Sequence, residues 1–282
     1  MIQGSLFPEL EGPPPRQAAV PKRPLRVAVL GSGSQGNAVV VEAGGRRLLI
    51  DAGFSCRELV KRLRRVGLEP EDVDALVLTH EHGDHVRGVA RFCRKHPVPV
   101  YATGGTLSQL AVRPESARLL RPCRSGEPFE AAGFVVEVFS VPHDAREPVG
   151  VVVEDPGGAR VGLVADLGCR SRLAWGRLQG VHALLLETNH DVEMLRNGPY
   201  PWSLKQRVAG RHGHLSNDEA AAGLPELHHD GLAHVVLYHL SQINNLPALA
   251  AASIGSVLGE LRSKATLTIS GQDDPTPWLT VG

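Results

Sequence analysis

The sequence predicts an α/β protein in which layered sheets are covered by helices. Short runs rich in Val, Leu and Ile recur along the chain, some of them close enough together to form hairpins. Segments with helical spacing separate other runs. The hydrophobic fraction of 42% is enough to give a chain of 282 residues a sizeable core.

The N-terminal segment, residues 1–24, differs from the rest of the chain. It contains six prolines between Pro8 and Pro24, and proline disfavours both helices and central strands. We therefore expect a flexible arm over residues 1–24 and a folded catalytic domain over residues 25–282.

The strand predictions rest on aliphatic and β-branched runs that are bounded by turn residues. One of them, residues 75–79, leads directly into a histidine-rich loop. In chain order, strands are predicted at 25–30, 38–42, 47–50, 75–79, 98–101, 134–140, 149–154, 161–165, 183–187, 234–238 and 265–269.

The first predicted helix begins after Ser55. Ser55 and Glu58 have the spacing of a capping box, apolar residues follow at helical spacing, and Gly67 can end the helix. Two further helices are predicted over residues 86–92 and 248–261.

Composition argues against a protein that binds nucleic acid or membrane through its overall charge, and against a disulfide-rich protein. The formal net charge is zero, so no global field draws the chain to nucleic acid or membrane, and aromatic residues make up only 4%. The four cysteines are far apart and contain no CxxC pair, which is a poor disulfide framework. We find neither a membrane span nor a signal peptide and expect a soluble, cytoplasmic protein with no membrane partner.

Four potential metal ligands lie within six positions of the histidine-rich loop. Imidazole nitrogen and carboxylate oxygen suit Zn²⁺, Mn²⁺ or Fe, and a tight loop can direct such side chains to one centre. The alternative is a solvated histidine-rich loop. The four residues are His80, His82, Asp84 and His85.

Three more candidate ligands lie at or just beyond the ends of predicted strands. They are His143, Asp166 and His239. A single histidine in such a place is more often structural, but together with the loop these residues complete two sites.

With these seven residues the chain resembles the metallo-β-lactamase superfamily, whose HxHxDH motif stands at residues 80–85. The resemblance spans nearly all of residues 25–282 and implies a four-layered αβ/βα sandwich with two divalent ions, Zn²⁺ or Mn²⁺, at one sheet edge. By this resemblance one ion is held by His80, His82 and His143, the other by Asp84, His85 and His239, and Asp166 bridges them.

Longer matching segments make the chain similar to the bacterial YycJ/WalJ family. That resemblance implies a metal-dependent exonuclease that digests duplex DNA from 5′ to 3′ in DNA repair. The interval from Asp166 to His239 is too short for the inserted domain of β-CASP RNA nucleases. The matching segments are 30–37, 142–148, 189–195, 198–205, 213–217 and 239–245.

The glycines at positions 31, 33 and 36 match the dinucleotide-binding fingerprint, and Asp51 lies where a ribose-binding acid would be expected. The fingerprint requires a helix after the third glycine, whereas a β-branched run follows here. We therefore predict a hairpin turn. Three polar side chains of this turn either contact substrate phosphate or only shape the turn: Ser32, Ser34 and Asn37.

Two residues are predicted to act in catalysis. Asp84 can orient or deprotonate the attacking water. His214 is the candidate acid for the leaving oxygen, with His190 as an alternative. Asp144 and Glu187 could support the ligating imidazoles by hydrogen bonds.

A basic, hydroxyl-rich segment follows residue 204. Ser216 and Glu219 form a capping box that opens an alanine-rich helix, whose first amides could bind an anion. The alternative is a capped helix with a solvated charged face. The predicted phosphate contacts in this segment are Lys205, His212, Ser216 and Asn217.

The sequence Gln3-Gly-Ser-Leu6-Phe7 resembles the short peptide that binds bacterial sliding clamps. Two apolar anchors on a flexible arm would tether the enzyme near DNA. The alternative is that Leu6 and Phe7 pack back on the domain.

Other functions compete with a DNA exonuclease. A hydrolase of the same fold could act on a thioester, lactone or β-lactam, because it would use the same metal ligands. RNA could be the substrate instead of DNA. A non-catalytic regulatory protein is disfavoured by the complete ligand set.

Overall fold

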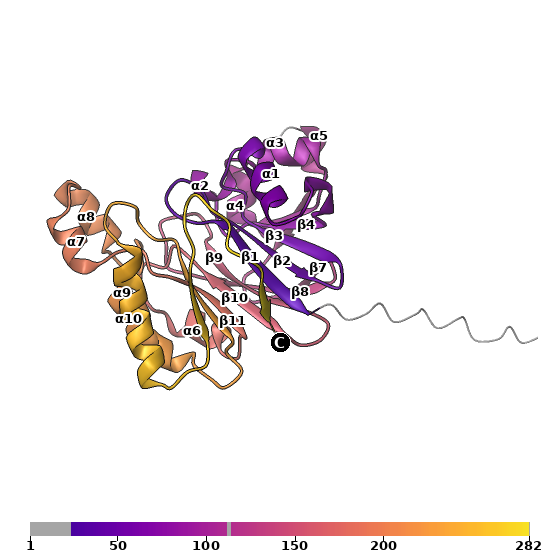
Figure 1. Cartoon of the computed structure of the whole chain (residues 1–282). Coiled ribbons are helices and arrows are strands. Elements are labelled where there is room, and N and C mark those ends of the chain that lie inside the picture. Colours follow the sequence, from indigo (N-terminus) through magenta and orange to yellow (C-terminus); the bar gives the residue numbers. More distant parts are fainter. Residues whose placement is uncertain (1–23, 112–113, 282) are drawn as a thin grey trace, which may run out of the picture.

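The computed structural model describes residues 24–111 and 114–281, which build two seven-stranded sheets packed face to face (Figure 1). The first sheet combines strands of the N-terminal half with the last strand of the chain. In spatial order it contains β14 (Leu279–Val281), β1 (Leu25–Gly31), β2 (Ala38–Ala43), β3 (Arg46–Ile50), β4 (Ala75–Val77), β5 (Val100–Thr103) and β6 (Leu120–Cys123).

Both sheets are antiparallel on one side and parallel on the other. The parallel parts are β3 to β6 in the first sheet and β10 to β13 in the second. Parallel neighbours end at the same edge of a sheet, where ligands collect in such folds. In spatial order the second sheet contains β13 (Thr266–Ile269), β12 (His234–Tyr238), β11 (Ala183–Glu187), β10 (Arg160–Val164), β9 (Val149–Glu154), β8 (Phe134–Ser140) and β7 (Phe129–Ala131).

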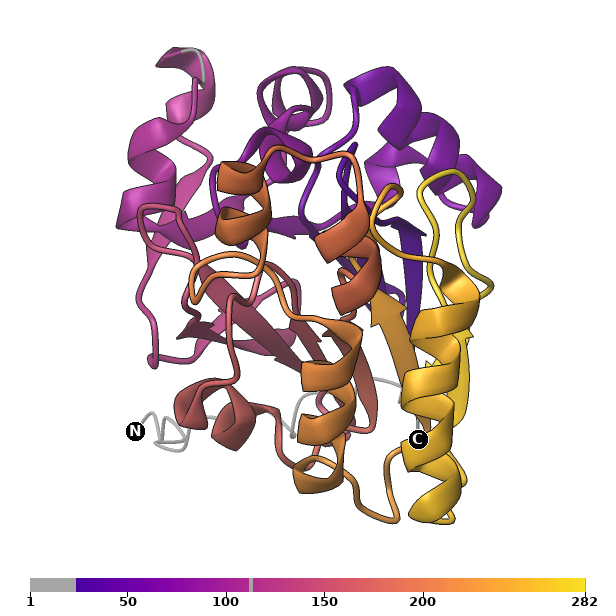
Figure 2. The ribbon, with the colours of Figure 1, turned by 90° about the vertical axis from the view of Figure 1, so that its left-hand side faces the viewer.

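Helices cover the outer face of each sheet. The first sheet is covered by elements of the N-terminal half, and the second by elements of the C-terminal half (Figures 1 and 2). The former are α1 (Cys56–Arg65), η1 (Pro70–Asp72), α2 (Gly83–Val86), α3 (Val89–Lys95), α4 (Gly104–Gln109) and α5 (Pro114–Ala117). The latter are α6 (Arg172–Leu178), α9 (Asn217–Gly223), η2 (Leu224–Glu226) and α10 (Pro247–Glu260). Two further helices, α7 (Val192–Asn197) and α8 (Trp202–Val208), project from the body of the molecule (Figure 1).

Three apolar layers hold this arrangement together. The layer between the two sheets contains Val27 and Val151. A second layer packs the first sheet against α1 and α3, through Leu63 among others. A third packs the second sheet against α6, α9 and α10, through residues such as Ile254. Each fully buried side chain of this kind stabilises the fold by about 1.5–3 kcal/mol. The predicted α/β class and four-layered sandwich are confirmed.

Most predicted elements are present within a residue or two of their expected bounds. The glycine-rich segment is a hairpin turn between the antiparallel strands β1 and β2. Gly33 has a φ of 141°, a backbone conformation that side chains rarely adopt. Ser55 caps α1 as predicted by accepting a hydrogen bond from the Glu58 amide. The short strands β6, β7 and β14 were not predicted, because none of them contains adjacent aliphatic residues as the equally short β4 does.

No helix in the described part of the chain is long and apolar enough to cross a membrane. The predicted clamp-binding residues Gln3, Leu6 and Phe7 lie outside the described residues. The division into an arm over residues 1–24 and a domain over 25–282 stays a prediction.

Candidate metal centre and active site

The seven candidate ligands converge at the edge where the parallel strands end. The loop after β4 carries His80, and the loop after β8 carries His143. Asp166 follows β10 and His239 follows β12. Both of the latter have a left-handed backbone, with φ values of 53° and 58°. This conformation is uncommon outside glycine and concentrates at functional sites.

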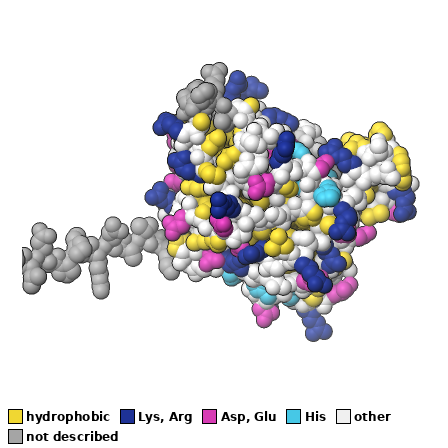
Figure 3. Space-filling model, turned by 180° about the vertical axis from the view of Figure 1, so that it is seen from behind, with side chains coloured by type: hydrophobic (Ala, Val, Ile, Leu, Met, Phe, Trp, Pro, Cys, Tyr) yellow, Lys and Arg dark blue, Asp and Glu magenta, His cyan; other side chains and the backbone are white. Residues whose placement is uncertain are grey.

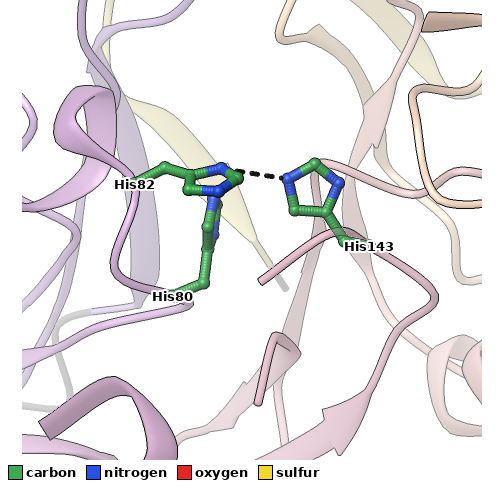
Figure 4. A group of neighbouring side chains, drawn as sticks. All are labelled: His80, His82 and His143. Atoms are coloured by element: carbon green, nitrogen blue, oxygen red, sulfur yellow. Dashed lines mark hydrogen bonds between the residues drawn. The ribbon is translucent and has the colours of Figure 1, made fainter. Parts of the chain in front are cut away.

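The first ligand group is His80, His82 and His143 (Figure 4). His82 Nδ1 lies 3.2 Å from His143 Nε2, and the ring centroids of His80 and His82 are 4.7 Å apart. One nitrogen of each ring lies within 4.8 Å of the others. Three imidazoles at this spacing can share one ion.

The second group is Asp84, His85 and His239. Asp84 Oδ2 lies 3.5 Å from His85 Nε2 and 3.4 Å from His239 Nε2. His85 is fully buried, whereas Asp84 is partly exposed. This carboxylate therefore forms the solvent side of the group.

Asp166 lies between the two groups. Its Oδ2 is 3.0 Å from His85 Nε2 and 4.0 Å from His80 Nε2. Its Oδ1 is 3.8 Å from His143 Nε2 and 3.6 Å from His239 Nδ1. One carboxylate thus reaches ligands of both groups, as a bridging residue must.

Hydrogen bonds at Nδ1 orient most of the candidate ligand rings. Thr79 Oγ1 lies 3.1 Å from His80 Nδ1, and His143 Nδ1 donates to the carbonyl of Gly213. His239 Nδ1 donates to Glu187 Oε1 at 3.1 Å. An outer partner at Nδ1 fixes the ring and leaves Nε2 free to ligate.

Asp51 was not assigned to the site from the sequence, yet it orients His85. It accepts hydrogen bonds from Thr79 N, Thr79 Oγ1 and His85 Nδ1, at 2.8, 2.9 and 2.7 Å. Its φ of 60° matches that of Asp166 and His239. Asp51 could have been predicted, because it also directly follows an apolar strand. In the sequence it had been considered only as the ribose-binding acid of the glycine fingerprint.

Opposite charges in the site shift one another's pKa. Burial would raise the pKa of Glu187, but His214 and the hydrogen bonds from His214 and His239 lower it to about 2. Burial alone would lower the pKa of His239, whereas Asp166 and the hydrogen bonds to Asp84 and Glu187 raise it to about 10. The carboxylates are therefore ionised and need positive charge beside them.

One atom at the centre of the site, His80 Nε2, is buried without a hydrogen bond. An unpartnered buried polar atom costs about 1–3 kcal/mol. A divalent ion would satisfy this atom and compensate the ionised carboxylates. The nitrogen and oxygen donors of the two groups therefore fit divalent metal ions.

A pocket of about 160 Å³ opens onto these ligands and is called the central pocket below. Ser34, Arg207 and His214 line it together with ligands from both groups. Arg207 on α8 donates to Asp144 Oδ2 at 2.7 Å. This contact attaches α8 to the loop that carries His143. A cation and an exposed hydroxyl beside the ligands suit a phosphodiester.

His214 lines the central pocket and donates from Nδ1 to Glu187 Oε1 at 2.9 Å. Burial lowers the pKa of His214, but the Glu187 carboxylate raises it above the usual value. Glu187 is fully buried and also accepts hydrogen bonds from the amides of Leu167 and Leu215. By contrast, His190 does not line the central pocket.

Several of the predicted phosphate contacts have other roles. Ser32 and Asn37 are buried and hydrogen-bond to each other, and Ser32 Oγ accepts from the amide of His239. Ser216 is buried and caps α9 in the predicted capping box, and Asn217 is buried against Asn245. Each of these four side chains takes part in a hydrogen bond within the protein that braces a loop or caps a helix.

The other predicted phosphate contacts are accessible. Ser34 lies in the central pocket. Lys205 donates to the carbonyl of Arg196 at 2.7 Å and lies on the far side of α8. His212 is exposed in the loop before His214. Of the predicted contacts, only Ser34 lines the central pocket, and the cation beside it is Arg207, from the same basic segment as Lys205.

Comparisons with known proteins agree with this geometry. Residues 46–240 match the beta-lactamase superfamily domain. The chain is 35% identical over 240 residues to exodeoxyribonuclease YycJ of Bacillus anthracis, covering 84% of this chain and 90% of that protein. It is 33% identical over 244 residues to exodeoxyribonuclease WalJ of Streptococcus pneumoniae, covering 84% and 89%. The metallo-beta-lactamase fold protein YhfI of Bacillus subtilis superimposes with a TM-score of 0.68 at 18% identity, covering 90% and 98%, which shows the fold alone.

Proposed function

Since the chain belongs to the beta-lactamase superfamily and, within it, to the YycJ/WalJ family, we propose that it is a dinuclear 5′-to-3′ DNA exonuclease that acts in DNA repair. At a coarser level, the chain is a metal-dependent hydrolase of the nuclease type, and its substrates are nucleic acids. The single observation that supports a dinuclear site best is the position of Asp166 between two complete ligand groups.

In this proposal His80, His82 and His143 hold one ion, and Asp84, His85 and His239 hold the other, with Asp166 shared. Zn²⁺ and Mn²⁺ both suit these donors. When bound, such ions supply activation of water and stabilisation of charge on phosphodiester oxygens.

Side chains of the protein orient the water, donate a proton and bind the phosphate. Asp84, at the solvent side of its group, orients the attacking water and accepts its proton. His214, fixed through Nδ1 by Glu187, donates a proton from Nε2 to the leaving oxygen. Arg207 and Ser34 hold phosphate oxygens in the central pocket. His212 and Lys205 provide positive or polar contacts along the strand outside it.

We place this activity in the cytoplasm. All four cysteines are free, and three of them are buried, as is usual in a reducing compartment. We also propose that residues 3–7 bind a sliding clamp. Replacing Leu6 and Phe7 by Ala should abolish binding to purified clamp and leave digestion of naked DNA unchanged. Retained clamp binding would refute this partner.

The central experiment is digestion of a linear, 5′-phosphorylated duplex by purified protein with Mn²⁺, with a label at either end. We expect nucleotides to be released progressively from the 5′ end. Asp84→Ala and a metal-free sample should be inactive. Release from the 3′ end would reverse the polarity, and digestion of matched RNA alone would reassign the substrate.

A different outcome would refute the nuclease itself. If DNA and RNA both survive while a thioester, lactone or β-lactam is hydrolysed, the chain is a small-molecule hydrolase of the same fold. The test needs the Asp84→Ala control in that arm too, because a contaminating hydrolase would not respond to it.

A further inference from the structure

A second hollow lies on the other side of α8 from the central pocket. It has a volume of about 480 Å³ and is formed by α7, α8 and the start of α9; we call it the α8 pocket. Leu204, Arg207 and Val208 face the central pocket, whereas Trp202, Lys205 and Gln206 face the α8 pocket. One short helix is therefore the common wall of both.

The α8 helix has no buried residue, although it stands next to the candidate active site. It projects with α7 from the body of the molecule in Figure 1, and hydrophobic side chains gather on this projecting lobe in Figure 3. Such a helix adds little to the core. Its side chains are therefore accessible to a ligand.

The most exposed large apolar side chain among the described residues is Trp202, with 68% of its surface accessible. Tryptophan is usually largely buried, and its flat ring is the best stacking surface available in a protein. Val192 and Leu195 add apolar lining to the same pocket. This combination fits a flat, partly apolar ligand.

The pocket also offers hydrogen-bonding groups. His190 lines it and is 2% exposed, and its Nδ1 is buried without a hydrogen-bond partner. The Asp218 carboxylate lies at the start of α9, where it can accept from an amino group. Lys205 and Arg196 place positive charge at the same pocket, where a phosphate of the strand would lie. Aromatic, polar and cationic groups in one pocket suit a nucleotide.

We propose that the α8 pocket receives an unstacked nucleobase of the strand whose phosphodiester lies in the central pocket, and that Trp202 stacks on that base. The proposal rests on the proposed nuclease function and names the part of the substrate that the enzyme recognises. A helix is about 10–12 Å across with its side chains, so the base belongs to a nucleotide close to the cleaved bond. The splayed base would draw the strand end across α8 and toward the ligands.

Binding without digestion tests this directly. The metal-loaded protein is titrated with a fluorescent, 5′-phosphorylated duplex whose linkages near both ends are uncleavable analogues, and with copies in which an abasic residue replaces the first, second or third nucleotide from either end. We expect an abasic residue at one of these positions to weaken binding about tenfold, the scale of one base–aromatic stack. Trp202→Ala should weaken binding of the intact duplex by a similar factor and lose the sensitivity to that abasic residue.

Two variants provide controls. Trp202→Phe retains an aromatic face and should keep most of the affinity and the position dependence. Leu173→Ala removes another exposed apolar side chain, on α6, and should bind like the wild type. If the wild type binds every duplex equally, or if Trp202→Ala keeps its sensitivity to abasic residues, the proposal is overturned.

The outcomes separate the pocket from the reaction. Base-dependent binding by a chain that digests no nucleic acid would refute the nuclease and leave the pocket assignment standing. Digestion with no dependence on any base near the end would support the nuclease and refute the pocket assignment. A matched RNA duplex completes the set, because base dependence with RNA alone would overturn the DNA assignment of the pocket.

Discussion

Glu187 and His214 are joined by a hydrogen bond of 2.9 Å from His214 Nδ1 to Glu187 Oε1, and the same oxygen accepts from His239 Nδ1 at 3.1 Å. One buried carboxylate thus fixes both a proposed proton donor and a proposed metal ligand. Its other oxygen is held by the amides of Leu167 and Leu215. The strand end that carries Glu187 therefore positions the proposed proton donor and the proposed metal ligand together.

We expect Glu187→Gln to lower nuclease activity by about 10- to 100-fold, the usual effect of losing an outer partner of a metal ligand. The amide is neutral and cannot hold two imidazole N–H groups as a carboxylate does. Activity and bound metal should be measured in the same preparation. Glu130→Gln, an exposed carboxylate on β7, is the matched control. Wild-type activity in Glu187→Gln would show that this carboxylate is only structural.

Replacing Asp84 should distinguish one ion from two. Asp84 belongs to only one of the two imidazole-containing groups that flank Asp166. We expect Asp84→Ala to lose only about one equivalent of metal per chain, because the His80 group stays complete. It should also lose nearly all activity, because Asp84 is the proposed acceptor of the proton from water. Metal content is measured by mass spectrometry on dialysed protein, with the exposed Asp230→Ala as control. Unchanged stoichiometry in Asp84→Ala would contradict its role as a ligand.

Gly53 supports the ligand loop without carrying a functional side chain. A Cβ atom at Gly53 would lie 1.6 Å from the backbone oxygen of Asp84, whereas a Cβ at Gly83 would meet no atom within 4 Å. We expect Gly53→Ala to push Asp84 aside and lower activity about 100-fold, the cost of a displacement of about 1 Å in an active site. Gly83→Ala, directly before Asp84 in the chain, should remain active. Equal activity of the two variants would disprove this steric coupling.

The cysteines should differ in reactivity. Burial raises the pKa of Cys93 to about 12 and that of Cys123 to about 11. Because a thiol reacts only as thiolate, both should stay unmodified by iodoacetamide at a pH of about 8, well below these values. Cys169 is partly exposed and should be alkylated first.

Peptide mass spectrometry of the folded protein identifies the alkylated positions, and the same reaction in guanidinium chloride should label all four cysteines. Rapid modification of Cys93 in the folded protein would mean that α3 opens readily on its sheet.

Local pattern was sufficient for much of this protein. The aliphatic runs, the capping residues Ser55 and Ser216, and the hairpin at Gly33 are decided by neighbours in the chain, so they could be predicted before the fold was known. The motif at residues 80–85 also indicates its chemistry locally, because four ligand-type residues in six positions have few other uses.

Tertiary structure decided what each polar side chain can reach. Ser32 and Asn37 looked like phosphate contacts in the sequence, but the packing of β1 and β2 against the ligand loops buries them. Asp51 joined the site because β3 ends beside β4. Glu187 had been suggested from the sequence as a partner of the imidazoles, and the position of β11 between β10 and β12 decided that its partners are His214 and His239. Burial and hydrogen bonding between residues distant in sequence depend on how the sheets stack, and no spacing along the chain records that.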